Sequence, residues 1–142
     1  MGDLTLTIQQ FSKPIDQIAE NFGIEFLVYF GSFQTEYYHS ESDIDIAFLT
    51  TRPLSIDEKT ELLEELILYH RKSEIDLVDL RTAEPIFRYE VARSGRVLYE
   101  RETGLFERYG LFYIKQCYEL KAVLEAEMQK IGKFIQEVTD HG

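Results

Sequence analysis

Residues 31–49 of this chain read GSFQTEYYHSESDIDIAFL. A Gly31-Ser32 pair is followed by ten residues and then by the triplet Asp43-Ile44-Asp45. Strand-like apolar residues stand before the pair and alternate with the aspartates. Because side chains of a strand point alternately to its two faces, Asp43 and Asp45 should share one face, roughly 7 Å apart. The pattern therefore predicts two strands joined by a polar loop, with two carboxylates on one face of the second strand.

These residue types suit nucleotide chemistry. Carboxylate oxygens on one face of a strand are ligands that Mg²⁺ prefers. A glycine corner lets a ligand approach the backbone closely, and free N–H groups there can hold phosphate. Each piece alone also fits an ordinary turn or a half-exposed strand. The combination indicates a phosphate cradle beside a metal platform.

The composition predicts one folded, acidic domain. Of the 142 residues, 44% are hydrophobic and 13% aromatic, which argues against disorder. The formal net charge of −11 does not attract nucleic acid, so we expect no direct nucleic-acid binding. A single cysteine excludes a disulfide within the chain and a Cys-rich zinc site. With no apolar run near the ~18 residues of a membrane span and no signal-like N-terminus, we expect a cytoplasmic protein.

Helical and strand patterns alternate around the central stretch. The first helix has Ser12 as a candidate cap, Pro14 in its first turn and Gly23 at its end, whereas residues 1–11 fit a frayed helix start or a short strand. Ser55 and Glu58 form a capping box for a second helix, and Thr82 is a plausible cap for a third. These two helices are expected over residues 55–70 and 83–94. Strands are expected over residues 25–30, 44–49, 74–80 and 96–100. This order predicts an α/β sandwich with a small mixed sheet of three to four strands.

Residues 103–138 form one long helical pattern, with apolar residues at steps of three and four. About 35 residues of helix would be ~50 Å long, whereas a compact domain of ~100 residues is only ~35 Å across. Such a helix either breaks near Gly132 and folds back, or presents its apolar face to a partner. We therefore divide the chain into a domain over residues 1–102 and a helical extension over residues 103–142 that forms an interaction surface. Leu124, Met128, Ile131 and Ile135 are expected to contact another chain.

The pattern Gly-Ser, ten residues, Asp-x-Asp resembles the signature of the DNA polymerase β-like nucleotidyltransferase superfamily. Within it, the short chain is most similar to the minimal nucleotidyltransferases (MNT) of antitoxin type. The resemblance covers about the first hundred residues. It implies a nucleotidyltransferase-like fold and the transfer of a nucleoside monophosphate, most simply AMP from ATP, to an acceptor hydroxyl.

The resemblance also implies roles for individual residues. Asp43 and Asp45 would hold two Mg²⁺ ions, and Gly31 and Ser32 would grip the nucleotide phosphates. Asp76 has the place of the third carboxylate of the family, and it would ligate the second ion and draw the acceptor hydroxyl towards deprotonation. The same aspartate is also readable as an exposed strand acid.

The chain departs from the family pattern after its Gly-Ser pair. Family members often read Gly-Ser-Arg-x-x-Gly, whereas this chain has Phe33 and Glu36 at the arginine and second glycine positions. The missing arginine removes a possible phosphate or acceptor contact. Four cations are possible substitutes, although each is also readable as a solvated surface charge: Arg52, Arg71, Lys72 and Arg81.

Three functions are open at this level. The resemblance favours an antitoxin that silences a partner toxin of the HEPN type by placing AMP on it. The altered loop keeps open an antitoxin that acts by contact alone. A third reading is an enzyme for a small-molecule hydroxyl, such as an aminoglycoside, with the acceptor site built by a homodimer through the C-terminal helix.

Overall fold

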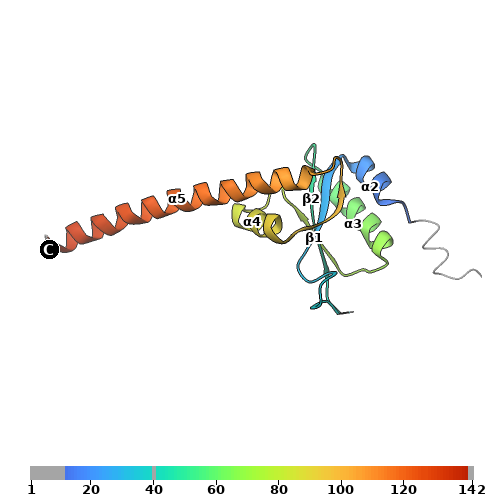
Figure 1. Cartoon of the computed structure of the whole chain (residues 1–142), viewed down its shortest axis with the longest axis horizontal. Coiled ribbons are helices and arrows are strands. Elements are labelled where there is room, and N and C mark those ends of the chain that lie inside the picture. Colours follow the sequence, from blue (N-terminus) through green and yellow to red (C-terminus); the bar gives the residue numbers. More distant parts are fainter. Residues whose placement is uncertain (1–11, 40, 141–142) are drawn as a thin grey trace, which may run out of the picture.

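The structure is a computed structural model that describes residues 12–39 and 41–140. It contains four helices and four strands in the described residues, and Figure 1 labels the helices together with strands β1 and β2. The order is α2 (Ile15–Phe22), β1 (Ile24–Phe30), β2 (Ile44–Thr50), α3 (Ile56–His70), β3 (Ile75–Asp79), α4 (Pro85–Ser94), β4 (Arg96–Glu100) and α5 (Leu105–Asp140). The alternative structures considered for residues 1–11 lie outside the described residues.

The four strands form one mixed sheet in the order β3-β2-β1-β4. Strand β1 pairs antiparallel with both β2 and β4, and β2 pairs parallel with β3. A parallel pair needs a long crossover connection, and α3 supplies it between β2 and β3. The predicted α/β sandwich with a small mixed sheet and a long C-terminal helix is therefore confirmed.

The sheet separates two apolar clusters. Helices α2 and α3 cover one face and α4 and the start of α5 cover the other, as Figure 1 shows. Strand β2 divides its side chains by parity: Ile44, Ile46 and Phe48 join the α2–α3 cluster, whereas Ala47 and Leu49 join the α4–α5 cluster. Asp45 therefore faces the same side of the sheet as α4 and α5.

The helix boundaries confirm part of the sequence prediction. Ser55 accepts a hydrogen bond from the Glu58 amide at 3.1 Å and Glu58 accepts one from the Ser55 amide at 3.1 Å, so the capping box is present. Gly23 ends α2 in the left-handed region, at φ 64°. The expected caps Ser12 and Thr82 were wrong, because Pro14 and Glu84 occupy the N-cap positions and neither makes a side-chain cap bond.

Helix α5 is continuous over 36 residues and passes through Gly132 without a break. Its first turns bury Leu105, Phe106 and Tyr113 against the domain, but every residue from 118 to 140 is exposed. Figure 1 shows the distal half of the helix projecting away from the sheet. The helix therefore does not fold back on its own domain. Within the described residues, no helix is long and apolar enough to cross a membrane.

Candidate active site

Three aspartates lie at the end of the sheet where β2 and β3 begin. Asp43 directly precedes β2, Asp45 is its second residue, and Asp76 is the second residue of β3. The parallel register places Asp45 beside Asp76. Partners in neighbouring strands share a face of the sheet, so the carboxylates of Asp45 and Asp76 lie on the side of α4 and α5. Asp43, two residues before Asp45, follows the same parity.

The electrostatics of Asp45 reflect these neighbours. Partial burial, and then the negative charges of Asp76 and Asp43, raise the pKa of the Asp45 carboxyl above its ordinary value. A divalent cation would offset this repulsion, so the chemistry of the donors fits Mg²⁺. The three side chains do not converge on a single point, and no group of three His, Cys, Asp or Glu side chains forms a ready metal cage in residues 12–39 and 41–140. Strand spacing separates the acids, so their rotamers would have to turn inward around an ion.

Gly31 forms the corner beside these acids. Phe30 pairs with Asp45 across the β1–β2 ladder, so Gly31 follows directly at the level of the carboxylate. Its φ of 73° lies in the left-handed region, which glycine adopts without steric cost. A β-carbon at this position would overlap Oδ2 of Asp45. Two independent constraints, backbone conformation and the close approach of Asp45, therefore favour glycine here.

The residues after the corner form a compact turn. The amide of Thr35 donates to the Ser32 carbonyl at 2.9 Å, and the Thr35 hydroxyl donates to the same oxygen at 2.5 Å. Gln34 adopts a positive φ of 65° within this turn. Ser32 is half-buried and stands next to the Gly31–Asp45 contact.

Phe33, in the place of the family arginine, packs into the domain. Its ring lies 4.7 Å from that of Tyr29 and 5.0 Å from that of Tyr38, measured between centroids. Beneath it, the Tyr29 hydroxyl and the His70 Nε2 are hydrogen-bonded at 2.7 Å. Burial raises the pKa of Tyr29 to about 12 and lowers that of His70, so both stay neutral at physiological pH. The substitution thus replaces a charge with an aromatic anchor for the loop.

Arg96, the first residue of β4, also holds this loop. Its Nη2 donates to the Gly31 carbonyl at 3.0 Å and to the Phe33 carbonyl at 2.6 Å. Sequence reasoning missed this residue. No local sequence signal marks it, because only the antiparallel β1–β4 pairing sets Arg96 beside Tyr29 at the end of β1. Arg96 and Phe33 together fix the loop on which Gly31 and Ser32 stand.

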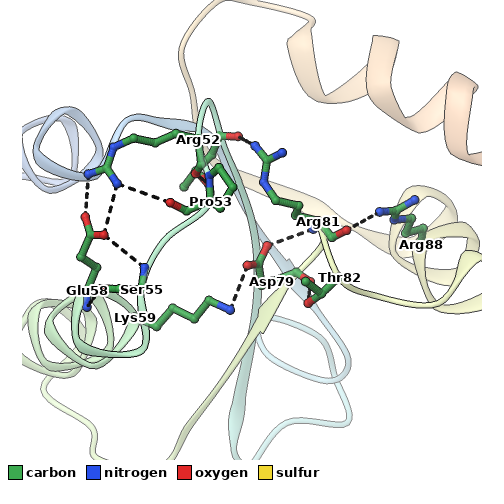
Figure 2. Close-up of polar contacts among 10 residues, drawn as sticks. Arg52, Pro53, Ser55, Glu58, Lys59, Asp79, Arg81, Thr82 and Arg88 are labelled. Atoms are coloured by element: carbon green, nitrogen blue, oxygen red, sulfur yellow. Dashed lines mark hydrogen bonds and ion pairs between the residues drawn. The ribbon is translucent and has the colours of Figure 1, made fainter.

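Two of the proposed substitute cations lie at the opposite end of the strands. Arg52 binds Glu58 at 2.6 Å, and Arg81 donates to the Thr50 carbonyl at 2.5 Å (Figure 2). Figure 2 also shows Asp79 bound to Lys59 of α3 at 3.1 Å, on the face away from Asp76. Strand β2 separates these contacts from the aspartates by roughly 20 Å. Arg52 and Arg81 therefore do not reach the site.

The other two cations lie nearer to it. Arg71 and Lys72 follow α3 and line a shallow hollow of about 530 Å³ that also includes Phe33, Ile44 and Glu74. The Lys72 ammonium lies 5.7 Å from the centre of the Tyr38 ring. This hollow is at the same end of the sheet as Asp43. It opens beside Ile44, whose side chain belongs to the α2–α3 face of the sheet. Both cations therefore lie on the opposite face of the sheet from the carboxylates of Asp45 and Asp76.

One end of the sheet thus carries Asp43 and Asp45 at the start of β2, Asp76 on the adjacent parallel strand and a glycine corner against Asp45. Comparison with known proteins identifies the family. The family described as "Polymerase beta, Nucleotidyltransferase" matches residues 13–104. The chain belongs to this family, and its relatives place it among the minimal, MNT-type members.

Two relatives are both named protein adenylyltransferase MntA. The protein from Shewanella oneidensis is 33% identical over 121 residues, covering 84% of this chain and 83% of the relative. The protein from Aphanizomenon flos-aquae is 26% identical over 123 residues, covering 80% and 81%. Among solved structures, a toxin–antitoxin complex with AMP-PNP contains a chain 26% identical to this one, with a TM-score of 0.66. The match covers 82% of this chain and 94% of that one.

Proposed function

We propose that this chain is a Mg²⁺-dependent adenylyltransferase that moves AMP from ATP to a hydroxyl of a partner toxin, and thereby acts as its antitoxin. The observation that carries the proposal is the placement of Asp45 between Asp43 and Asp76, directly against Gly31. The names of the MntA relatives, and the AMP-PNP in a structure similar to this chain, support the adenylyl group. The partner would be of the HEPN type with which MNT antitoxins pair.

The proposed reaction is one phosphoryl-type transfer. The acceptor hydroxyl oxygen attacks the α-phosphorus of ATP, the bond to the bridging oxygen breaks, and pyrophosphate leaves. Asp43 and Asp45 would hold the metal ions together with Asp76, and the ions when bound would neutralise charge on the phosphates. Asp76 would accept the proton of the acceptor hydroxyl as its oxygen attacks, and would release that proton to solvent after pyrophosphate has left.

The Gly31–Ser32 corner would hold the departing phosphates. Gly31 permits close approach because it lacks a β-carbon, and Ser32 offers a backbone amide and a hydroxyl. Arg96 donates to the Gly31 and Phe33 carbonyls and so holds the backbone of the loop on both sides of Ser32. Since the loop is held by Arg96 and Phe33, it needs little reorganisation when the nucleotide binds.

The test is a direct transfer assay. The protein is incubated with Mg²⁺, each nucleoside triphosphate and the toxin encoded by the neighbouring gene, and both proteins are weighed by mass spectrometry. We expect the toxin to gain one or more AMP groups with ATP, and none after chelation of the metal or with Asp43→Asn. Binding of the toxin without any mass change would support the contact-only antitoxin. Modification of an aminoglycoside, with no change of either protein, would support the small-molecule enzyme.

The ATP requirement is consistent with action in the cytoplasm. The acidic surface, with a net charge of −11, also fits a protein acceptor better than a nucleic acid.

A further inference from the structure

The distal half of α5 carries a row of exposed apolar side chains. Six positions follow a seven-residue repeat and make up what we call the α5 stripe: Leu120, Leu124, Glu127, Ile131, Phe134 and Val138. Each apolar member has between 41% and 65% of its surface exposed. The stripe is ~27 Å long, and large exposed apolar patches of this kind mark interaction surfaces.

Two adjoining grooves extend the α5 stripe back towards the domain. One, of about 350 Å³, lies between α4 and α5 and is lined by Ile86, Tyr89 and Cys117, together with Tyr118 and Lys121. The next, of about 270 Å³, shares Ile86 and Cys117 with the first and continues along α5 to Leu124 and Met128. The grooves thus join the N-terminal turn of α4 to the exposed half of α5.

The same turn of α4 lies next to the candidate active site. Phe87, which follows Ile86, stacks edge-on against Phe30 with 5.3 Å between ring centroids. Phe30 is the cross-strand partner of Asp45. A chain lying in the grooves would therefore extend from the α5 stripe towards the face of the sheet that carries the aspartates. This continuity favours an occupant that also enters the active site.

Glu127 argues against a second copy of this chain as the occupant. It stands near the middle of the α5 stripe, and no stripe position is Lys or Arg. In an antiparallel pair centred at Glu127 the two carboxylates would meet, and in a pair centred two residues later each would face Ile131. Either arrangement buries a carboxylate that faces no cation at a stripe position of the other copy, which is costly. Lys130 reaches Glu127 along the same helix at 3.3 Å, but that pair is exposed and contributes little.

The overall charge points the same way. Two copies would bring together chains of net charge −11 each, whereas a basic partner would be attracted. We propose that the α5 stripe and the adjoining α4–α5 grooves form the docking site for the acceptor protein, which presents an apolar helix or ridge with a Lys or Arg opposite Glu127. The inference rests on the proposed function, because the occupant is the toxin whose hydroxyl receives AMP.

The experiment measures steady-state AMP transfer to the toxin for two matched double variants of the full chain. Leu124→Asp with Ile131→Asp places two charges on the stripe. Ala122→Asp with Gln129→Asp places two charges seven residues apart on the opposite side of the helix. All four positions are exposed, so both variants should fold, and thermal melting checks this.

We expect the stripe variant to raise the KM for the toxin about tenfold or more, with an unchanged affinity for AMP-PNP. The control variant should stay within about twofold of the wild type. Equal KM values in the two variants would overturn the proposal. So would a wild-type protein that is dimeric alone and becomes monomeric in the stripe variant, because a second copy would then be the occupant.

Single variants of Glu127 test the expected cation. Glu127→Lys should weaken toxin binding more than Glu127→Gln, because it sets like charges against each other. Tighter binding of the lysine variant would refute a facing cation. The failure of the proposed function and the failure of the docking site give different results. Toxin binding through the stripe without AMP transfer would contradict the proposed function and support the docking site. AMP transfer that the stripe variant does not affect would support the proposed function and contradict the docking site.

Discussion

Substitution of Gly31 by alanine tests the geometry of the candidate site most directly. The backbone at Gly31 is left-handed, with φ 73°, and alanine pays about 1–2 kcal/mol to adopt that conformation. In a domain of this size, the loss should lower the melting temperature by roughly 3–6 °C. The new β-carbon would also overlap Oδ2 of Asp45, so either the carboxylate or the corner must move.

A shift of this kind acts on the chemistry as well as on stability. Misplacement of a reacting group by ~1 Å costs on the order of 10²-fold in rate. We therefore expect Gly31→Ala to lose about 10²-fold in AMP transfer and to bind AMP-PNP more weakly. Gly104→Ala is the matched control, because Gly104 also has a positive φ, of 85°, but a β-carbon there meets no atom within 4 Å.

The assay compares thermal melting, calorimetric binding of AMP-PNP with Mg²⁺, and transfer for both variants. Both should lose similar stability, and only Gly31→Ala should lose nucleotide affinity and rate. Equal activity in the two variants would refute the assignment of the Gly31–Asp45 contact to the site. A Gly31→Ala protein as stable as the wild type would refute the strain argument.

Three further outcomes follow from the contacts. Asp45→Asn should abolish AMP transfer, because it removes a carboxylate that would hold the metal, and wild-type transfer rates would contradict this role of Asp45. The melting temperature of the metal-free protein should stay unchanged or rise, because the substitution removes the repulsion of Asp45 with Asp76 and Asp43. Arg96→Ala should weaken AMP-PNP binding about tenfold, and the affinity of Arg96→Lys should lie between those of Arg96→Ala and the wild type. The reason is that each hydrogen bond from a charged donor contributes ~1.5–3 kcal/mol before solvent screening. A changed kcat with unchanged nucleotide affinity would count against a positioning role for Arg96. Hydrogen bonds from Arg52 lower the pKa of Glu58 to about 2, so Glu58→Gln should reduce the free energy of unfolding at pH 7. Urea unfolding should show the difference between wild type and variant shrink as the pH falls below 4.5 and vanish near pH 2, because protonated Glu58 loses the same bonds. A difference that does not change with pH would disprove this stabilising role of the Glu58 carboxylate.

Local patterns were sufficient to predict the helices and strands of the described residues and to propose two of the candidate aspartates. The strand over residues 96–100 was predicted with the bounds that β4 has, because apolar residues bounded by Gly95 are a local signal. Asp43 and Asp45 could be placed on one face from strand parity alone. The caps at Ser12 and Thr82 were wrong because a capping residue type is common, and only the backbone decides whether it is used.

The pairing of distant segments required the tertiary structure. Asp76 is brought beside Asp45 by the parallel register of β2 and β3, which the α3 crossover sets and no local pattern encodes. Arg96 contacts carbonyls that are 63 and 65 positions away in the chain. A side chain with that reach carries no periodic signal, so its role was not readable in advance.

The sequence by itself determined the helical periodicity of α5 and the surplus of apolar residues on its distal half, because both are properties of spacing along one helix. It left open whether the helix breaks at Gly132. Only the tertiary structure decided that the helix runs straight past the edge of the domain, since the sheet offers apolar surface to the first turns alone. The α5 stripe is therefore left exposed, and this exposed apolar surface is the physical reason for expecting a partner there.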